Sequence, residues 1–213
     1  MRRPLAFSPQ PMDRAAMFFD PLLYGFVFLG LFTPGPNVIM LTSSGARFGF
    51  ARSLPHLFGV VLGVGITAAV TSMGVGAIVT ASPWVNLALK TGAGAFILWM
   101  AWGLWKASAK PRAAADPDAR PLSFWAAVLF QWINPKVWAV AFAASAGYGA
   151  AQAMWFEALR LGVAFSSVNL MVLLFWTAAG SLLTALLEHP LAWKIFLRVM
   201  ALLLALSTLL VFR

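Results

Sequence analysis

The chain has 213 residues, of which 62% are hydrophobic and only 10% are charged, and its mean hydropathy is +0.85. A soluble domain carries about 25% charged residues, so this composition excludes an ordinary soluble protein and predicts a chain that lies in a lipid bilayer. The 15 Lys and Arg residues outnumber the 6 Asp and Glu residues, but the cations lie in short segments between apolar runs and form no basic stripe, which argues against nucleic acid as a partner.

The chain is also poor in the side chains that most enzymes and metal sites use. It contains no cysteine and only two histidines, and its acidic residues lie near the predicted linkers or ends. Thiolate chemistry is therefore excluded, and the apolar segments lack the carboxylate or histidine clusters that would bind a metal. We predict no catalytic residues, no metal site and no cofactor, so we do not expect an enzyme.

Six apolar segments follow an N-terminal tail that lacks the apolar core of a cleaved signal peptide. The start of the natural chain is Met1, Met12 or Met17. Because a spanning helix needs roughly 20 apolar residues, each segment is long enough to cross a membrane. The predicted spans are 17–44, 54–80, 84–105, 122–148, 159–187 and 191–212.

The first segment is interrupted by a Pro-Gly-Pro motif. Proline lacks a backbone donor and clashes with the preceding turn, so a helix breaks there and leaves polar backbone groups free. In lipid these groups must be satisfied by protein or must line a wet cavity. The residues of this break that we assign to a binding site are Thr33, Pro34, Gly35, Pro36 and Asn37.

The fourth segment carries a second break, about a hundred residues later in the chain. Two proline or glycine interruptions at matching places in two halves of a chain are typical of a transporter's binding site. The residues that this break adds to the predicted site are Gln131, Asn134, Pro135 and Lys136.

The hydrophilic linker 106–121 divides the chain into two sets of three segments, 17–105 and 122–213. Weak similarity between the halves, together with an odd number of spans in each, predicts an inverted repeat. The alternative is that the two apolar sequences resemble each other by chance. The predicted fold is an all-α membrane protein, a single domain over 1–213, with helices 1 and 4 broken at Pro34-Pro36 and Pro135.

The distribution of cations predicts the orientation. Lys and Arg accumulate in cytoplasmic loops, and here they cluster after the first, third and fifth segments. These three loops should therefore be cytoplasmic. The cations in them are Arg47, Arg52, Lys106, Lys110, Arg112, Arg120 and Lys194.

Lys136 is the most informative single residue of the predicted site. A lysine within a membrane span is costly and is usually functional or paired, and no acidic residue lies deep in a predicted span. Its ammonium could therefore meet the carboxylate of a substrate. The alternatives are that Lys136 reaches the interface by snorkelling and that the prolines only kink two helices for packing.

Several stretches together resemble the LysE/RhtB family of bacterial amino-acid exporters. They are Phe32-Thr33-Pro34-Gly35-Pro36-Asn37-Val38 in the first segment, the loop Ser44-Gly45-Ala46-Arg47-Phe48-Gly49, and Gln131-Trp132-Ile133-Asn134-Pro135-Lys136 in the fourth. The run Ser123-Phe124-Trp125-Ala126 is similar to the branch that exports cysteine and O-acetylserine.

The resemblance implies a secondary transporter in the bacterial inner membrane that exports amino acids or their metabolites, and we expect coupling to the proton gradient. The expected partners are a small-molecule substrate, the lipid bilayer and, as an open alternative, further copies of the chain in a homo-oligomer. The other hypothesis is a scaffold or assembly factor with the same architecture and no transport activity.

Overall fold

The computed structural model describes residues 18–33, 35–74, 83–109, 119–148, 153–183 and 189–211, and within these ranges all regular structure is helical. The predicted all-α class is therefore confirmed. The helices are α2 (Pro21–Phe32), α3 (Pro36–Phe48), α4 (Phe50–Ser72), α6 (Pro83–Ser108), α7 (Phe124–Ile133), α8 (Pro135–Tyr148), α9 (Met154–Leu182) and α10 (Pro190–Ser207), and the 3-10 turn η3 (Thr208–Val211) follows α10.

Both predicted interruptions occur. The first span is divided into α2 and α3, which meet at an angle of 61°. Pro34 lies outside the described residues, and α3 begins with Pro36 at its first position. The fourth span is divided at Asn134, which has an extended backbone between α7 and α8. Proline therefore opens the second half-helix in both cases, where its missing N–H costs no hydrogen bond.

The second helix begins earlier than the predicted range 54–80 and ends at Ser72, and residues 75–80 of that range lie outside the described residues. It runs over Phe50–Ser72, and a single residue, Gly49, separates it from α3. Gly49 has φ of +82°, a conformation that favours glycine, and its N–H caps α3 by donating to the Gly45 carbonyl. The tight connection places Arg52 inside the first turns of α4.

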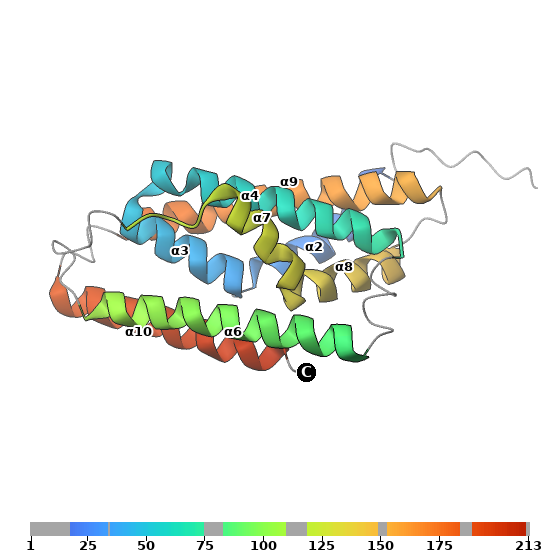
Figure 1. The fold of residues 1–213 in the computed structure, drawn as a ribbon. Helices are drawn as coiled ribbons and strands as arrows, with labels where there is room; N and C mark the ends of the chain where they lie inside the picture. The colour runs from blue at the N-terminus through green and yellow to red at the C-terminus, as the bar shows by residue number, and fades with distance from the viewer. Residues whose placement is uncertain are drawn as a thin grey trace, which may run out of the picture.

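The bundle has two parts (Figure 1). The larger part surrounds α4 and α9, which pack against each other along their length. The helix α9 also packs on α2 and α3, whereas α4 packs on α7 and α8, so each long helix lies against the broken span of the other half. The smaller part is the pair α6 and α10, which packs on α3 and α7 through a second apolar core.

Glycines allow the backbones of the larger part to approach closely. A Cβ atom on Gly45 of α3 would meet the Thr177 carbonyl of α9, and one on Gly180 of α9 would meet the Thr42 carbonyl of α3. Gly59 and Gly63 do the same for α4 against α7, as their small-xxx-small spacing predicts.

By length and composition, two described helices could cross a membrane alone, α4 and α9, and the bent pair of α2 and α3 could form a third span. At about 1.5 Å per residue, the 23 residues of α4 extend roughly 34 Å, which exceeds the hydrocarbon thickness of about 30 Å. The full count of six spans and the inverted repeat stay predictions.

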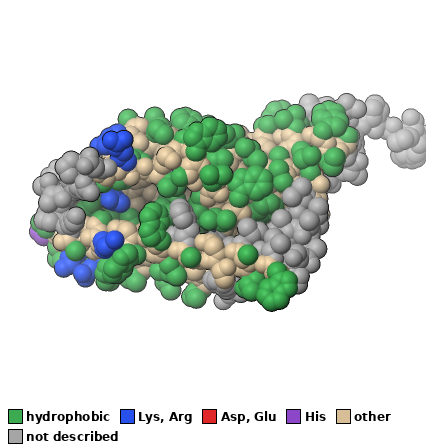
Figure 2. All heavy atoms as spheres, in the orientation of Figure 1, with side chains coloured by type: hydrophobic (Ala, Val, Ile, Leu, Met, Phe, Trp, Pro, Cys, Tyr) green, Lys and Arg blue, Asp and Glu red, His purple; other side chains and the backbone are tan. Residues whose placement is uncertain are grey.

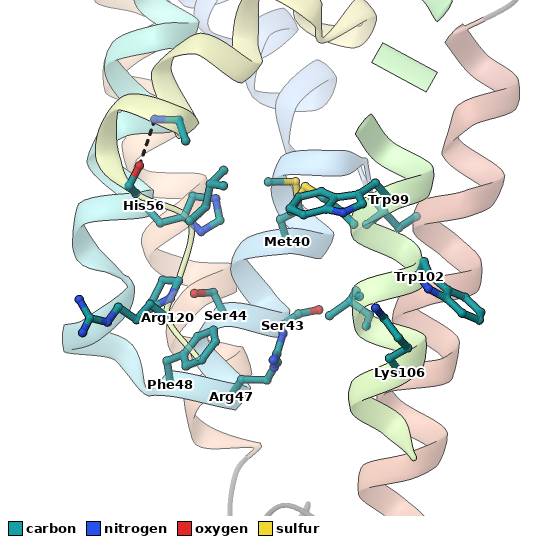
Figure 3. Close-up of a pocket in the computed structure, with 18 residues that line it drawn as sticks. Met40, Ser43, Ser44, Arg47, Phe48, His56, Trp99, Trp102, Lys106 and Arg120 are labelled. Atoms are coloured by element: carbon teal, nitrogen blue, oxygen red, sulfur yellow. Dashed lines mark hydrogen bonds between the residues drawn. The ribbon is translucent and has the colours of Figure 1, made fainter. Parts of the chain in front are cut away.

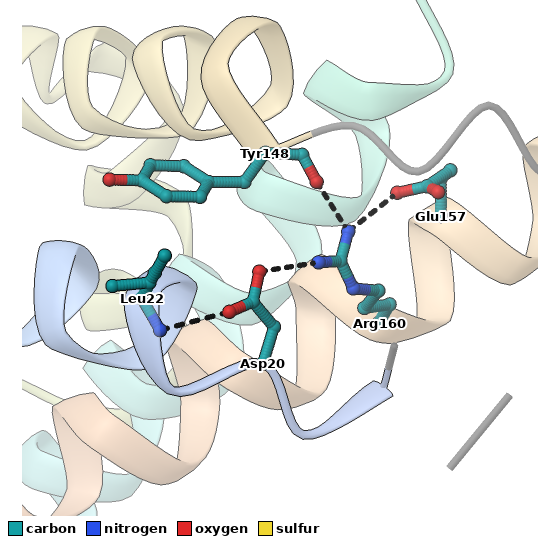
Figure 4. A network of polar contacts seen from close by, with 5 residues as sticks. All are labelled: Asp20, Leu22, Tyr148, Glu157 and Arg160. Carbon is teal, nitrogen blue, oxygen red and sulfur yellow. Dashed lines mark hydrogen bonds and ion pairs between the residues drawn. The ribbon is translucent and has the colours of Figure 1, made fainter. Parts of the chain in front are cut away.

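One end of the bundle is closed by a buried arginine (Figure 4). Arg160 of α9 is 2% exposed and forms ion pairs with Asp20 at 3.4 Å and Glu157 at 3.2 Å. It also donates to the Tyr148 carbonyl at 2.7 Å. The network joins the start of α2, the end of α8 and the first turns of α9. By the distribution of cations, this is the end predicted to face outward.

Candidate binding site at the two helix breaks

The two breaks meet inside the bundle through a cluster of amide side chains. Asn37 Nδ2 donates to Gln131 Oε1 at 2.8 Å, and Gln131 Nε2 donates back to Asn37 Oδ1 at 3.2 Å. Asn134 Nδ2 donates to the same Gln131 oxygen at 3.3 Å. Gln131 and Asn134 are almost completely buried, so the cluster is a polar site within an apolar core.

Lys136 joins the breaks a second time. Its ammonium donates to the hydroxyl of Thr33 at 2.9 Å and also to the Thr33 carbonyl, which the first break has left without a helical partner. The side chain lies over Gly35, where a Cβ atom would come within 3.0 Å of Lys136 Nζ. Glycine at position 35 therefore leaves room for the cation to cross between the two halves.

The second halves of both broken spans begin at this site. No side chain caps α3 within the described structure, because its N-cap residue is glycine. Asn134 Oδ1 caps α8 by accepting from the Lys136 N–H at 3.2 Å. Helix N-termini carry a partial positive charge, so two of them and an ammonium make this region favourable for an anion.

A small cavity lies between the breaks. Its volume is about 10 Å³, which is the size of roughly one water molecule. Its polar lining comes from Asn37, Asn134, Lys136 and Asn169, and the last of these has a buried Nδ2 with no partner among the described residues. In this conformation the site is nearly closed, and one amide donor is left free toward it.

The structure brings together most of the residues that the sequence predicts for the site. Gly35, Pro36, Asn37, Asn134 and Lys136 line the small cavity directly. Gln131 and Thr33 do not line the cavity, but each forms a hydrogen bond with a side chain that does. Pro135 is the first residue of α8. Pro34 lies outside the described residues.

Sequence reasoning missed Asn169. It lies on α9, and the sequence signal for it was a lone asparagine in the middle of an apolar segment. Only the packing of α9 against α2 and α3 brings this residue to the breaks.

A second, larger cavity, shown in Figure 3, lies beside the C-terminal ends of α3 and α6, whereas Arg160 lies in the first turns of α9. We call this cavity the vestibule. Its volume is about 430 Å³, and it lies between α3, α4 and α7 on one side and α6 and α10 on the other. The charged and buried polar residues in its lining include Ser43, Arg47, His56, Lys106 and Arg120. Figure 2 shows lysine and arginine side chains gathered at this end.

These features define a class of protein: a helical membrane protein with a buried polar site where two broken helices meet. The family is shown by comparison of the sequence, because the profile of the LysE type translocators matches residues 28–212. The chain belongs to this family of translocators.

Curated relatives match a part of the chain. It is 36% identical over 105 residues to a protein of Klebsiella pneumoniae named cysteine/O-acetylserine efflux protein, and the match covers 49% of this chain and 52% of the relative. Proteins of the same name from Escherichia coli K12 and Shigella sonnei are 37% identical over 108 residues, again 49% of this chain and 52% of theirs. The chain thus matches about half the length of these relatives. No solved structure shows significant similarity to it.

Family membership confirms three predictions. The resemblance stated from the sequence motifs is correct, the chain is a multi-pass protein of the inner membrane, and its family is one of translocators and not of enzymes.

Proposed function

We propose that this protein exports a small amino acid or an amino-acid derivative from the cytoplasm. The observation that carries the proposal is the meeting of both helix breaks at one buried polar site that Lys136 spans. The named activity of the relatives, efflux of cysteine and O-acetylserine, supports a small and mostly uncharged side chain on the substrate.

The chemistry of the site suits an amino acid. The substrate carboxylate would be held by the uncapped N-terminus of α3, by the Asn169 amide and by the Lys136 ammonium, which would leave the Thr33 carbonyl. The released carbonyl could then accept from the substrate ammonium. Amide side chains donate and accept, so Asn37 and Gln131 can exchange their mutual bonds for bonds to the substrate.

Transport requires that this site open to one side at a time. Arg160 closes the end predicted to be outside, and the vestibule lies toward the end predicted to be cytoplasmic. We infer that the described conformation faces the cytoplasm and that the inverted repeat, with α4 and α9 each packed on the opposite broken span, supplies the outward-facing counterpart.

We further propose that the proton gradient drives export. The scaffold hypothesis remains the competing function, and it needs no cavity and no free polar groups at the breaks. The free Asn169 donor and the ammonium held between the two breaks favour transport.

The test is uptake of labelled O-acetylserine by inside-out membrane vesicles, in which export appears as accumulation. Vesicles that contain the protein should accumulate the solute when a proton gradient is imposed and lose it when a protonophore is added. Vesicles without the protein are the control. No transport of O-acetylserine, cysteine or serine at normal abundance in the membrane would favour the scaffold, and transport unaffected by the protonophore would reject proton coupling.

A further inference from the structure

The vestibule has the size and the lining of a binding site distinct from the two helix breaks. Small-molecule sites have volumes of about 300–1,000 Å³, and the vestibule, at about 430 Å³, lies in that range. The site at the breaks, by contrast, holds about one water molecule. With the vestibule toward the cytoplasm, as proposed above, a solute from that side would meet the vestibule before the breaks.

The vestibule is positively charged. Arg47, Lys106 and Arg120 line it, and none of the described residues in its lining is acidic. The Arg47 guanidinium lies 4.8 Å from the centre of the Phe48 ring, and Lys106 Nζ lies 5.9 Å from that of Trp102, so aromatic rings accompany both of these cations. A cleft lined by one sign of charge concentrates ions of the other sign.

Neutral polar groups in the same lining are also unsatisfied. Ser43 and His56 are each 2% exposed, and neither the Ser43 hydroxyl nor the two His56 ring nitrogens has a partner among the described residues. The neighbouring Ser44 differs, because it pairs with Ser53 at 2.8 Å. Buried polar atoms are almost always hydrogen-bonded in proteins, so free ones in a cavity wall are completed by water or by a polar ligand that displaces it.

Ser43 and Arg47 stand four residues apart and so lie on one face of α3, directed toward α6 (Figure 3). A hydroxyl beside a guanidinium is a suitable pair of donors for a carboxylate. We propose that the vestibule binds the substrate carboxylate before translocation, through Arg47 and Ser43, and thereby restricts export to solutes that carry no positive side chain. This inference rests on the proposed export function and deepens it by naming the charge class of the substrate.

The experiment compares Arg47→Gln with Arg52→Gln in inside-out vesicles, whose outer face is the cytoplasmic one. Arg52 is exposed and contributes to the same predicted cytoplasmic loop, but it does not line the vestibule, so it controls for effects of the lost charge on topology. The measurements are the half-saturation concentration for O-acetylserine and its inhibition by serine, aspartate and lysine.

In the parent protein we expect inhibition by serine and aspartate and little by lysine. Arg47→Gln should raise the half-saturation concentration on the order of tenfold, as the loss of one charge-assisted hydrogen bond would do, and should weaken inhibition by aspartate the most. Arg52→Gln should behave like the parent. Equal inhibition by lysine and serine in the parent would overturn the inference and leave export intact, and so would equal half-saturation concentrations for Arg47→Gln and Arg52→Gln. An inactive parent would instead reject the export function itself.

Anionic lipid headgroups are another source of negative charge for these cations. The same measurements are therefore repeated in proteoliposomes of purely zwitterionic lipid and with anionic lipid added. If Arg47 binds the substrate carboxylate, Arg47→Gln should raise the half-saturation concentration in both kinds of proteoliposome. An effect seen only with anionic lipid would assign the cations to headgroup binding and would overturn the proposal.

Discussion

At the scale of the residue, Gln131 is the side chain that joins the two halves of the site. Its amide bonds Asn37 from the first break and Asn134 from the second, and its Nε2 also donates to the Ala127 carbonyl at 3.0 Å. Because Gln131 is fully buried, each of these bonds compensates for lost water. The geometry of the breaks thus depends on one amide.

A double-mutant cycle on Asn37 and Gln131 should reveal this coupling. Either single change to alanine removes both mutual hydrogen bonds of the two amides, which costs about 1–3 kcal/mol of the free energy of unfolding. The double variant should lose less than the sum of the two, because the mutual bonds of Asn37 and Gln131 are lost once and not twice. The measurement is reversible unfolding of the purified protein in detergent, and strictly additive losses would show that the two amides act independently.

The sequence predicted the residues of the breaks but not their contacts. Pro36 and Pro135 are visible because proline has a local effect on the helix, and Lys136 is visible because a charge in an apolar run is unusual. That the Lys136 ammonium bonds Thr33, or that Asn169 reaches the same cavity, depends on how distant helices pack. No local pattern carries that information.

At the scale of the element, close helix packing depends on single glycines. Gly180 of α9 lies where a Cβ atom would meet the Thr42 backbone of α3, and Gly45 of α3 meets α9 in the same manner. Without large side chains between them, the two helices can hold the start of α3 close to Asn169. The same packing brings the first break to the second.

Gly180→Ala should therefore destabilise the protein although alanine favours helices. The added methyl group meets backbone and cannot be accommodated by rotating a side chain, so we expect a loss of about 1–3 kcal/mol. Gly25→Ala on α2 is the matched control, since nothing lies within 4 Å of its added Cβ, and it should be neutral or slightly stabilising. Thermal unfolding in detergent compares the two, and equal effects would contradict the packing described here.

The Arg160 network is the second feature at this scale, because it ties three helices at one end. Arg160→Met removes a buried donor from Glu157 and from the Tyr148 carbonyl, both of which are half-buried. Breaking a buried ion pair costs about 3–5 kcal/mol, and the cost here should be lower because Asp20 is 28% exposed.

The exposed Arg52→Met is the control for that change and should stay within about 0.5 kcal/mol of the parent. Unfolding free energies of the two variants give the comparison. If Arg160→Met were as stable as the control, the network would not hold that end of the bundle together.

At the scale of the whole molecule, charge is distributed unequally between the two ends. Arg47, Lys106 and Arg120 lie around the vestibule, and Asp20 and Glu157 pair with Arg160 at the other end. Loop cations alone predicted this polarity from the sequence, since each lies beside the end of an apolar run. The pairing of α6 with α10, and the vestibule between this pair and α3, α4 and α7, could not be predicted, because the sequence of an apolar helix does not indicate its neighbours.

Reporter fusions test the orientation. A fusion between 109 and 115 should report the cytoplasm, because the linker carries several cations, and a fusion at 81–83 should report the outside. The two positions flank α6, so a spanning α6 must place them on opposite sides. The same report from both would contradict the six-span arrangement.

The central claim is that the meeting point of the two breaks binds the substrate, and Lys136 tests it most directly. The measurement is the initial rate of O-acetylserine uptake by inside-out vesicles against concentration, normalised to protein in the membrane. Lys194→Met is the control, because it removes an exposed lysine away from the breaks. Lys136→Met should raise the half-saturation concentration about tenfold or more at unchanged abundance, and Lys136→Arg should recover only part of the loss. An unchanged half-saturation concentration in Lys136→Met would contradict the account.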